Sequence, residues 1–282
     1  MRNNEDRLGS KKTSASPAAS VAAQSGPAPL EFVRPTTILA LPSKGKFYPE
    51  NHPLHNQETI EIRQMTTAEE DVLTNATLLR NGTALDKFLE RILIDSRVGP
   101  SDLLVGDKNA VLIQSRIDGY GSDYTTQVVC PSCSAKQSFN FNLEDSFQEV
   151  ETDLSEGTVA TGNGTFAITL DNGWEVEYRA MTGADETKMA KLVSNKKKAS
   201  LQETPIQDQL NMIIVSVSGH TDKSTISQAV QHMTGKQSRL IRESYRKSIP
   251  NVELRSEFSC SSCGTATEME VPLTADFFWA RT

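Results

Sequence analysis

The amino-acid sequence predicts an α+β protein built from two similar units, each with a strand hairpin, helices and a cysteine knuckle. Two observations carry this prediction. All four cysteines fall into two Cys-x-x-Cys pairs, Cys130/Cys133 and Cys260/Cys263, and each pair is flanked by alternating apolar and polar residues. Several motifs of the first half also recur in the same order in the second half, which indicates an internal duplication.

The chain has 282 residues and a formal net charge of −7. This length is sufficient for one or two domains with a hydrophobic core. The negative charge argues against a surface that follows a phosphate backbone, so protein partners are expected and nucleic acid is not. No apolar run is long enough to span a membrane, and the first residues lack a signal-peptide pattern, so we expect a cytosolic location.

Four segments are expected from the pattern of composition. Residues 1–33 are rich in Ser, Ala, Pro and Gly and are poor in bulky apolar residues, which predicts a disordered N-terminal arm. Residues 34–150 form the first repeat unit and end in the first knuckle. A linker follows over residues 151–164, and residues 165–282 form the second unit, which ends in the second knuckle.

The first unit is predicted to begin with strands and to continue with helices. Residues 36–41 and 58–63 have strand patterns, and Pro42 to Gly45 between them is typical of a turn. Thr66 and Glu69 form a capping-box motif, which predicts a helix start. Further helices are expected over residues 71–80, 85–94 and 109–116, before the strands that flank the first cysteine pair.

The second unit repeats this order. A hairpin is expected over residues 165–178, with Asn172 and Gly173 as a primed two-residue turn. Thr182 and Asp185 then match the first capping box. The segment 208–215 parallels 86–93, and 235–240 parallels 107–112. From the strands that flank the cysteines onward, the two units align without gaps at one constant difference in residue number. It pairs Val128, Cys130, Cys133, Phe139, Phe141, Leu143 and Phe147 with Phe258, Cys260, Cys263, Met269, Val271, Leu273 and Phe277.

The cysteine pairs predict one structural zinc ion per chain, bound by Cys130, Cys133, Cys260 and Cys263. Two thiolates from each tight turn complete the tetrahedral set of a zinc ribbon. The pairs are far apart in the sequence, so a shared site requires the two units to lie side by side. Disulfides or free thiols and a redox pair are the alternatives, although strands rather than helices follow both motifs, which disfavours redox chemistry. Gly264 suits the positive φ of a knuckle.

No catalytic constellation is found in the sequence. Gly235-Lys236 lacks the rest of a phosphate-binding loop, and His52 and His55 lie in a Pro-rich loop without companion ligands. A zinc ion with four thiolate ligands has no open position for a substrate or for water. We therefore expect neither enzymatic activity nor a small-molecule substrate.

Two surface features are candidates for partner binding. Phe278 and Trp279 end an aromatic run and are assigned equally to core packing and to partner docking. Lys196 to Lys198 are read as a basic loop between helices. A second basic group recurs along a predicted helix and is most simply explained as its solvent-exposed face. Its members are Arg239, Arg242, Arg246 and Lys247. A nucleic-acid-binding zinc-ribbon adaptor is the competing function, because ribbons also serve nucleic-acid machines.

The sequence resembles the baseplate hub and hub-assembly protein family of T-even-type myophages. The resemblance rests on residues 41–49 (LPSKGKFYP), 65–70 (MTTAEE), the Cys-Pro-Ser-Cys motif at 130 and the closing segment 260–279. It implies a non-enzymatic role, either as a virion structural protein of the hub or as an assembly chaperone. The implied partners are other tail and baseplate hub proteins, and the implied location is the cytoplasm of the infected bacterium or the virion tail.

Overall fold

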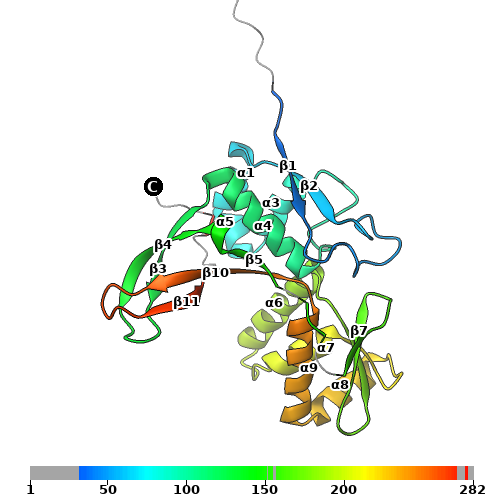
Figure 1. Ribbon diagram of the computed structural model, residues 1–282. Coiled ribbons are helices and arrows are strands. Elements are labelled where there is room, and N and C mark those ends of the chain that lie inside the picture. Colours follow the sequence, from blue (N-terminus) through cyan, green and yellow to red (C-terminus); the bar gives the residue numbers. More distant parts are fainter. Residues whose placement is uncertain (1–31, 151, 155–156, 272–276, 279–282) are drawn as a thin grey trace, which may run out of the picture. The chain divides into compact units, whose positions relative to one another are not determined.

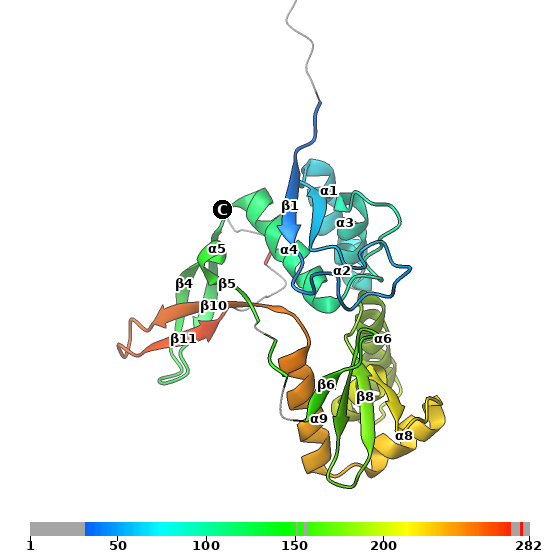
Figure 2. The ribbon, with the colours of Figure 1, turned by 45° about the vertical axis from the view of Figure 1, so that its right-hand side comes forward.

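The computed structural model describes residues 32–150, 152–154, 157–271 and 277–278 (Figures 1 and 2). The chain divides into two parts after Val33. The described residues of the first part, Phe32 and Val33, are 91% and 80% exposed. The rest of the predicted N-terminal arm lies outside the described residues. Every described helix and strand belongs to the part that begins at Arg34.

The protein is a mixed α+β fold, as the sequence predicts. Its described strands form small antiparallel sheets with the orders β1-β2, β3-β4, β11-β10-β5 and β6-β7-β8-β9. The strands are β1 (Thr36–Ala40), β2 (Thr59–Arg63), β3 (Asp123–Val129), β4 (Lys136–Asn142), β5 (Phe147–Glu149), β6 (Thr158–Ala160), β7 (Thr165–Thr169), β8 (Glu175–Arg179), β9 (Ile214–Val217), β10 (Val252–Ser259) and β11 (Ala266–Glu270). The helices are α1 (Thr67–Thr74), α2 (Ala76–Asn81), α3 (Ala84–Ile92), α4 (Val105–Tyr120), α5 (Leu143–Ser146), α6 (Gly183–Lys198), α7 (Pro205–Ile213), α8 (Lys223–His232) and α9 (Gly235–Ser248). No described helix has the length and apolar character needed to cross a membrane.

Both predicted capping boxes are present. Thr66 donates from its backbone N and from Oγ1 to Glu69 at 3.1 and 2.7 Å at the start of α1. Thr182 makes the same two bonds to Asp185 at 3.1 and 3.2 Å at the start of α6. The predicted helix 71–80 is instead divided between α1 and α2. Asn75 causes the break because its side chain caps α2, as asparagine does at many helix starts.

Each half of the chain begins with a hairpin of the same register. Thr36 faces Arg63 across β1 and β2, and Thr165 faces Arg179 across β7 and β8. Each threonine hydroxyl also donates to a glutamate of the neighbouring strand, at 2.7 and 2.5 Å. The turn of the second hairpin has three residues rather than the predicted two. Only Gly173 in it has a positive φ, of 82°, whereas a primed two-residue turn requires two such residues.

The helices α3 and α7 also match in position, with one correction to the predicted pairing. Both have nine residues, and they end at Ile92 and Ile213. The residue after each helix then bridges back to the hairpin of its own half: Leu93 reaches β2, and Ile214 reaches β8. Ile92 therefore corresponds to Ile213, one residue away from the pairing predicted from sequence. The predicted helix 208–215 ends early because its β-branched residues from Ile214 onward join a sheet as β9.

Two further segments contain structure that the sequence did not predict. Within the predicted linker 151–164, residues 158–160 form β6, which pairs with β7. The helix predicted over 109–116 is longer and begins at Val105. Glycine is a poor helix former, yet Gly106 is needed there because a Cβ atom at this position would lie 2.3 Å from the carbonyl oxygen of Pro250. Close packing thus extends α4 past a residue that local propensity disfavours.

Buried apolar side chains form two clusters. The first cluster joins the helices of the first half to the cysteine hairpins and includes Cys130 and Cys260. The second cluster lies between the sheet of β7 and β8 and helices α7 to α9. Phe47 and Ile249 pack against both clusters. The cysteine hairpins are therefore anchored in a core that draws residues from both halves of the sequence.

Candidate metal centre

The two Cys-x-x-Cys loops have the same backbone structure. In each, the N–H of the first cysteine donates to the carbonyl five residues on, and its carbonyl accepts from the N–H four residues on. These hydrogen bonds of Cys130 and Cys260 all measure 2.9 Å. The residue after the second cysteine has a positive φ in both loops, 60° at Ser134 and 70° at Gly264. The prediction for Gly264 is confirmed, and Ser134 adopts the same conformation without being glycine.

The structure brings all four cysteines together. Their sulfur atoms lie within 4.8 Å of one another. Cys130 Sγ is 3.8 Å from Cys263 Sγ, and Cys133 Sγ is 3.7 Å from Cys260 Sγ. A tetrahedron with zinc–sulfur distances of about 2.3 Å separates its sulfur atoms by about 3.8 Å. The separations of 3.7 and 3.8 Å therefore match what a tetrahedral metal ion with four thiolate ligands requires.

The hairpins β3/β4 and β10/β11 lie side by side and hold these loops in place (Figures 1 and 2). Phe139 of β4 contacts Phe258 of β10 edge to face, with ring centroids 5.3 Å apart. Gln137 links the loops directly. Its amide nitrogen donates to the carbonyl of Ser259 at 3.1 Å, and its amide oxygen accepts from the backbone N and hydroxyl of Ser261 at 3.0 and 2.9 Å. Both core packing and polar contacts thus join the two hairpins.

The four thiol groups differ in their exposure and acidity. Cys130 and Cys260 are buried, whereas Cys133 and Cys263 are exposed. Hydrogen bonding to Thr265 lowers the pKa of Cys263 to about 6. The backbone N–H of Ala135 favours the thiolate of Cys133, but hydrogen bonding to the other cysteines, Cys263 foremost, together with desolvation of the sulfur, outweighs it and raises the pKa of Cys133 to about 12.

These pKa values have a chemical consequence for the cluster. Neighbouring thiolates repel one another, so the first ionisation opposes the next. A divalent cation would remove this opposition, because metal binding deprotonates its cysteine ligands. The donor set is four sulfur atoms, which suits zinc more than a hard cation such as magnesium. A metal ion held by all four would have no open position for catalysis.

Sequence reasoning did not identify Gln137 and Thr265 as parts of this centre. Gln137 is one polar residue among several in an alternating strand, and its role depends on which hairpin lies beside it. Thr265 Oγ1 lies 3.1 Å from Cys263 Sγ. Its place two residues after the last cysteine is the only sequence signal for this contact.

The aromatic residues near the C-terminus lie in the core where the structure describes them. Phe278 is 4% exposed, and its ring centroid is 5.5 Å from that of Phe88. Its side chain therefore follows the core-packing alternative and offers no exposed ring for partner docking. Phe277 is also buried, and its carbonyl accepts a hydrogen bond from the buried Arg116 at 2.8 Å. Trp279, the other candidate anchor, lies outside the described residues.

The basic residues are distributed differently from expectation. Lys196 to Lys198 form the last turn of α6 rather than a loop. Positive side chains at this end of a helix are stabilising because they interact favourably with the helix dipole. Lys196 also pairs with Asp208 at 2.6 Å. The arginines at 239, 242 and 246 lie on α9, as predicted. Within the described part of the chain, the four cysteines are the one group placed to bind a metal ion, and His52 and His55 do not join it.

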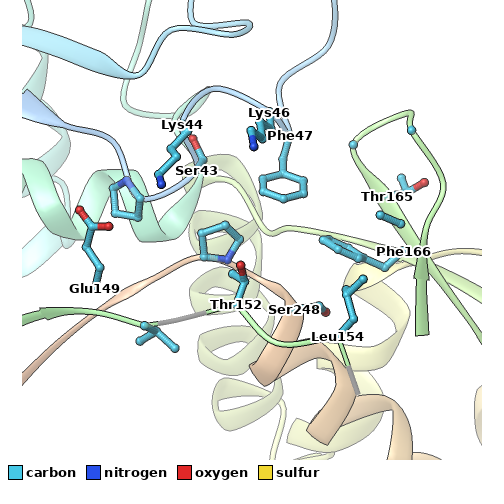
Figure 3. Close-up of a pocket in the computed structure, with 16 residues that line it drawn as sticks. Ser43, Lys44, Lys46, Phe47, Glu149, Thr152, Leu154, Thr165, Phe166 and Ser248 are labelled. Atoms are coloured by element: carbon cyan, nitrogen blue, oxygen red, sulfur yellow. The ribbon is translucent and has the colours of Figure 1, made fainter. Parts of the chain in front are cut away.

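The loop between β1 and β2 is held by a buried carboxylate. Asp107 Oδ1 accepts from the backbone N of Ser43 at 3.0 Å, and Oδ2 accepts from the hydroxyls of Ser43 and Tyr48 at 2.6 and 2.7 Å. Burial raises the pKa of Asp107. The same loop borders a pocket of about 810 Å³ (Figure 3), in which Phe47 faces Phe166 at 5.3 Å between ring centroids.

Comparison with known protein families gives a match over most of the chain. The model of a family described as T4 bacteriophage base plate protein matches residues 34–279. No curated protein and no solved structure matches the chain. The matched segment spans the hairpins, the helices and both cysteine loops.

Proposed function

The chain belongs to the family of T4 bacteriophage base plate proteins, and we propose that it is a non-enzymatic component or assembly chaperone of the central baseplate hub of a contractile tail. The family resemblance seen in the sequence motifs is confirmed by this match over residues 34–279. The hub-specific role is the part that we propose. Membership of the family implies other phage baseplate proteins as partners.

The observation that best supports a scaffolding role is the geometry of the four cysteines. We propose that Cys130, Cys133, Cys260 and Cys263 bind one structural zinc ion per chain. The sulfur separations of 3.7 and 3.8 Å agree with tetrahedral coordination. Each half of the sequence supplies one pair of ligands, so the ion would link the two halves. Such a link fixes the geometry of a protein that must hold several partners.

The proposed duplication accounts for why one ion joins two distant motifs. The matched hairpin registers, capping boxes and cysteine loops support two copies of one unit over residues 34–150 and 165–282. In this view each copy carries half of a metal site. Neither half is sufficient alone, because structural zinc requires four ligands.

The role in the hub can be tested by following the protein through infection. Purification from infected cells at successive times, with parallel analysis of finished virions, separates a hub component from an assembly chaperone. A hub component is found in virions in fixed proportion to other baseplate proteins. A chaperone associates with baseplate proteins early and is absent from virions.

A second measurement separates this proposal from the nucleic-acid adaptor. Purified protein is mixed with DNA and RNA at low and high salt, and tagged protein is isolated from infected cells. We expect capture of baseplate proteins and no salt-sensitive nucleic-acid binding. Salt-sensitive binding of nucleic acid without capture of any baseplate protein would contradict the proposed function.

A further inference from the structure

A pocket of about 450 Å³ beside α9 contains two arginines that form no ion pair within the described residues. Arg242 and Arg246 lie one helical turn apart and line the pocket together. Neither forms an ion pair or a hydrogen bond within the described ranges, and the Nε atom of Arg242 is buried without a partner. The remaining lining residues are Val105, Gly106, Val150, Met181, Glu186, Gln209, Tyr245, Ile249, Pro250, Asn251 and Glu253.

The acidic residues of the pocket do not neutralise these arginines. Glu186 pairs with Lys108 at 3.1 Å, and Glu253 pairs with Arg255 at 2.5 Å. Each carboxylate therefore already has a cationic partner, although Lys108 also pairs with Asp86 and Arg255 also pairs with Glu268. Glu243, which interacts with Arg246 electrostatically, is itself paired with Arg239. The pocket thus offers two guanidinium groups whose N–H donors are not used by an ion pair within the described residues.

The unpaired groups favour a carboxylate ligand. A buried N–H without an acceptor costs free energy, which a ligand oxygen would recover. Guanidinium groups match the planar fork of a carboxylate, and such charge-assisted hydrogen bonds are stronger than neutral ones. Tyr245 borders the same space, and its hydroxyl accepts from the backbone N of Met181 at 3.2 Å, which leaves the hydroxyl proton free to be donated.

The surroundings favour a protein carboxylate over a phosphate backbone. Of the other basic residues of α9, Lys236 pairs with Asp171 at 3.3 Å and Arg239 pairs with Glu243 at 2.7 Å, whereas Lys247 forms no ion pair within the described residues. The ion pairs at positions 236 and 239 interrupt the basic stripe that would follow successive phosphates. The two unpaired arginines form one compact site, which fits one or two acidic side chains.

We infer that the pocket formed around Arg242 and Arg246 binds an acidic segment of a partner protein through its carboxylates. This inference rests on the proposed function, because the partner is expected among baseplate proteins. It assigns a binding role to two members of the basic run on α9.

The binding chemistry can be tested on the purified full-length protein. The NMR signal of the Arg242 Nε–H group is followed during titration with a capped tetraglutamate peptide, a capped tetraglutamine peptide and inorganic phosphate. We expect a saturable shift with the glutamate peptide, no shift with the glutamine peptide and weaker binding of phosphate. No saturable shift with the glutamate peptide, or tighter binding of phosphate, would overturn the inference.

Variants locate the effect. The double change Arg242→Gln with Arg246→Gln is expected to lower the affinity for the glutamate peptide at least about tenfold. Gln209→Glu keeps both arginines but places a carboxylate beside them, so it should also weaken binding. Lys236→Gln, on the same helix but outside the pocket lining, is the matched control and should bind normally. Equal loss in the control, or normal affinity in Gln209→Glu and in the double variant, would contradict the assignment.

Capture from infected cells distinguishes this inference from the proposed function. Wild-type protein that captures baseplate proteins, while the double variant loses at least one of them, supports both. Identical capture by wild type and the double variant overturns the pocket and leaves the proposed function intact. A wild-type protein that captures no baseplate protein contradicts the proposed function, while the peptide titration still decides the chemistry of the pocket.

Discussion

The hairpins that begin the two halves share their register but are closed in different ways. Residues 41–58 connect β1 to β2 in a long loop, whereas three residues, 171–173, close β7 and β8. The third residue of a later helix holds the connection in each half. Asp107 of α4 accepts from the hydroxyl of Ser43 at 2.6 Å, and Gln237 of α9 donates to Asp171 at 2.7 Å.

The difference teaches that the same position of a helix can hold a hairpin connection in both halves through different chemistry. Asp107 is an acceptor that orders a long loop through three hydrogen bonds. Gln237 is a donor that holds a short turn by one hydrogen bond to Asp171. Asp107 and Gln237 also fit the constant offset of the cysteine strands. Pairing Asp107 with Gln237 shifts the predicted alignment of 107–112 with 235–240 by two residues.

The largest expected effect comes from breaking the link between the halves. Cys263→Ser removes one ligand of the proposed zinc site without emptying the core, because this side chain is exposed. We expect a loss of more than about 4 kcal/mol in the free energy of unfolding, as for other lost metal sites. Chemical denaturation measures it, and both halves should loosen together. Ser262→Ala in the same loop is the control, and equal stability of the two variants would contradict a metal link.

The next effect distinguishes the two ways of closing a hairpin. Asp107→Ala leaves three donors without their acceptor and is expected to cost about 3 kcal/mol. Gln237→Ala removes one hydrogen bond to the turn and one from the backbone N of Thr234, and it is expected to cost about 2 kcal/mol. Denaturant midpoints of the two variants measure the contrast. A cost for Gln237→Ala equal to or above that of Asp107→Ala would show that the long loop depends on other contacts.

A smaller loss of stability is expected from changes at the capping boxes, a feature that the two halves share. Thr66→Ala and Thr182→Ala each remove the hydroxyl of a capping box and should cost about 1 kcal/mol. The two losses are expected to be similar, because both helix starts have the same hydrogen bonds. Thr74→Ala at an exposed helix end should change stability by less than about 0.5 kcal/mol. Thermal unfolding of the three variants measures this, and a clear difference between the first two would weaken the proposed equivalence.

The smallest effect is a difference in pH dependence. Burial opposes ionisation of Asp185, but Arg179 and Thr182 outweigh it and hold the pKa of Asp185 below its usual value. Its contribution to stability is present above the ordinary aspartate pKa and is lost as pH falls through the lowered value. Burial raises the pKa of Asp107, so its contribution is present at low pH and is lost as pH rises through the raised value.

Melting temperatures measured from neutral to acidic pH test these opposite signs. Asp185→Asn should make the acid loss of stability shallower than in wild type. Asp107→Asn should make it steeper, because a group that favours the folded state at low pH has been removed. The reverse order of slopes would contradict the assigned pKa directions.

The sequence was sufficient for features that depend on local chemistry. Both capping boxes, the hairpin at residue 165 and the positive φ of Gly264 were predicted because short-range rules determine them. The approach of the cysteine pairs was expected only through the repeat pattern. It could not be derived from spacing, since the pairs lie more than a hundred residues apart in the chain.

Features set by tertiary contacts were missed or misplaced. The start of α4 was placed too late because glycine at position 106 argues against a helix. The close approach of Gly106 to Pro250 that requires glycine there cannot be deduced from the sequence. The strand β9 was assigned to a helix because a short apolar run fits both structures until a neighbouring strand is known. Gln137 could not be recognised as a bridge between the cysteine loops before the hairpins were placed side by side.

The central claim is that one metal ion joins the two halves through four cysteines. Elemental analysis of the purified full-length protein, prepared without chelators, tests it most directly. We predict about one zinc ion per chain, retained in Ser262→Ala and largely lost in Cys263→Ser. Two zinc ions per chain, or a metal-free protein with four titratable thiols and unchanged stability, would contradict the account.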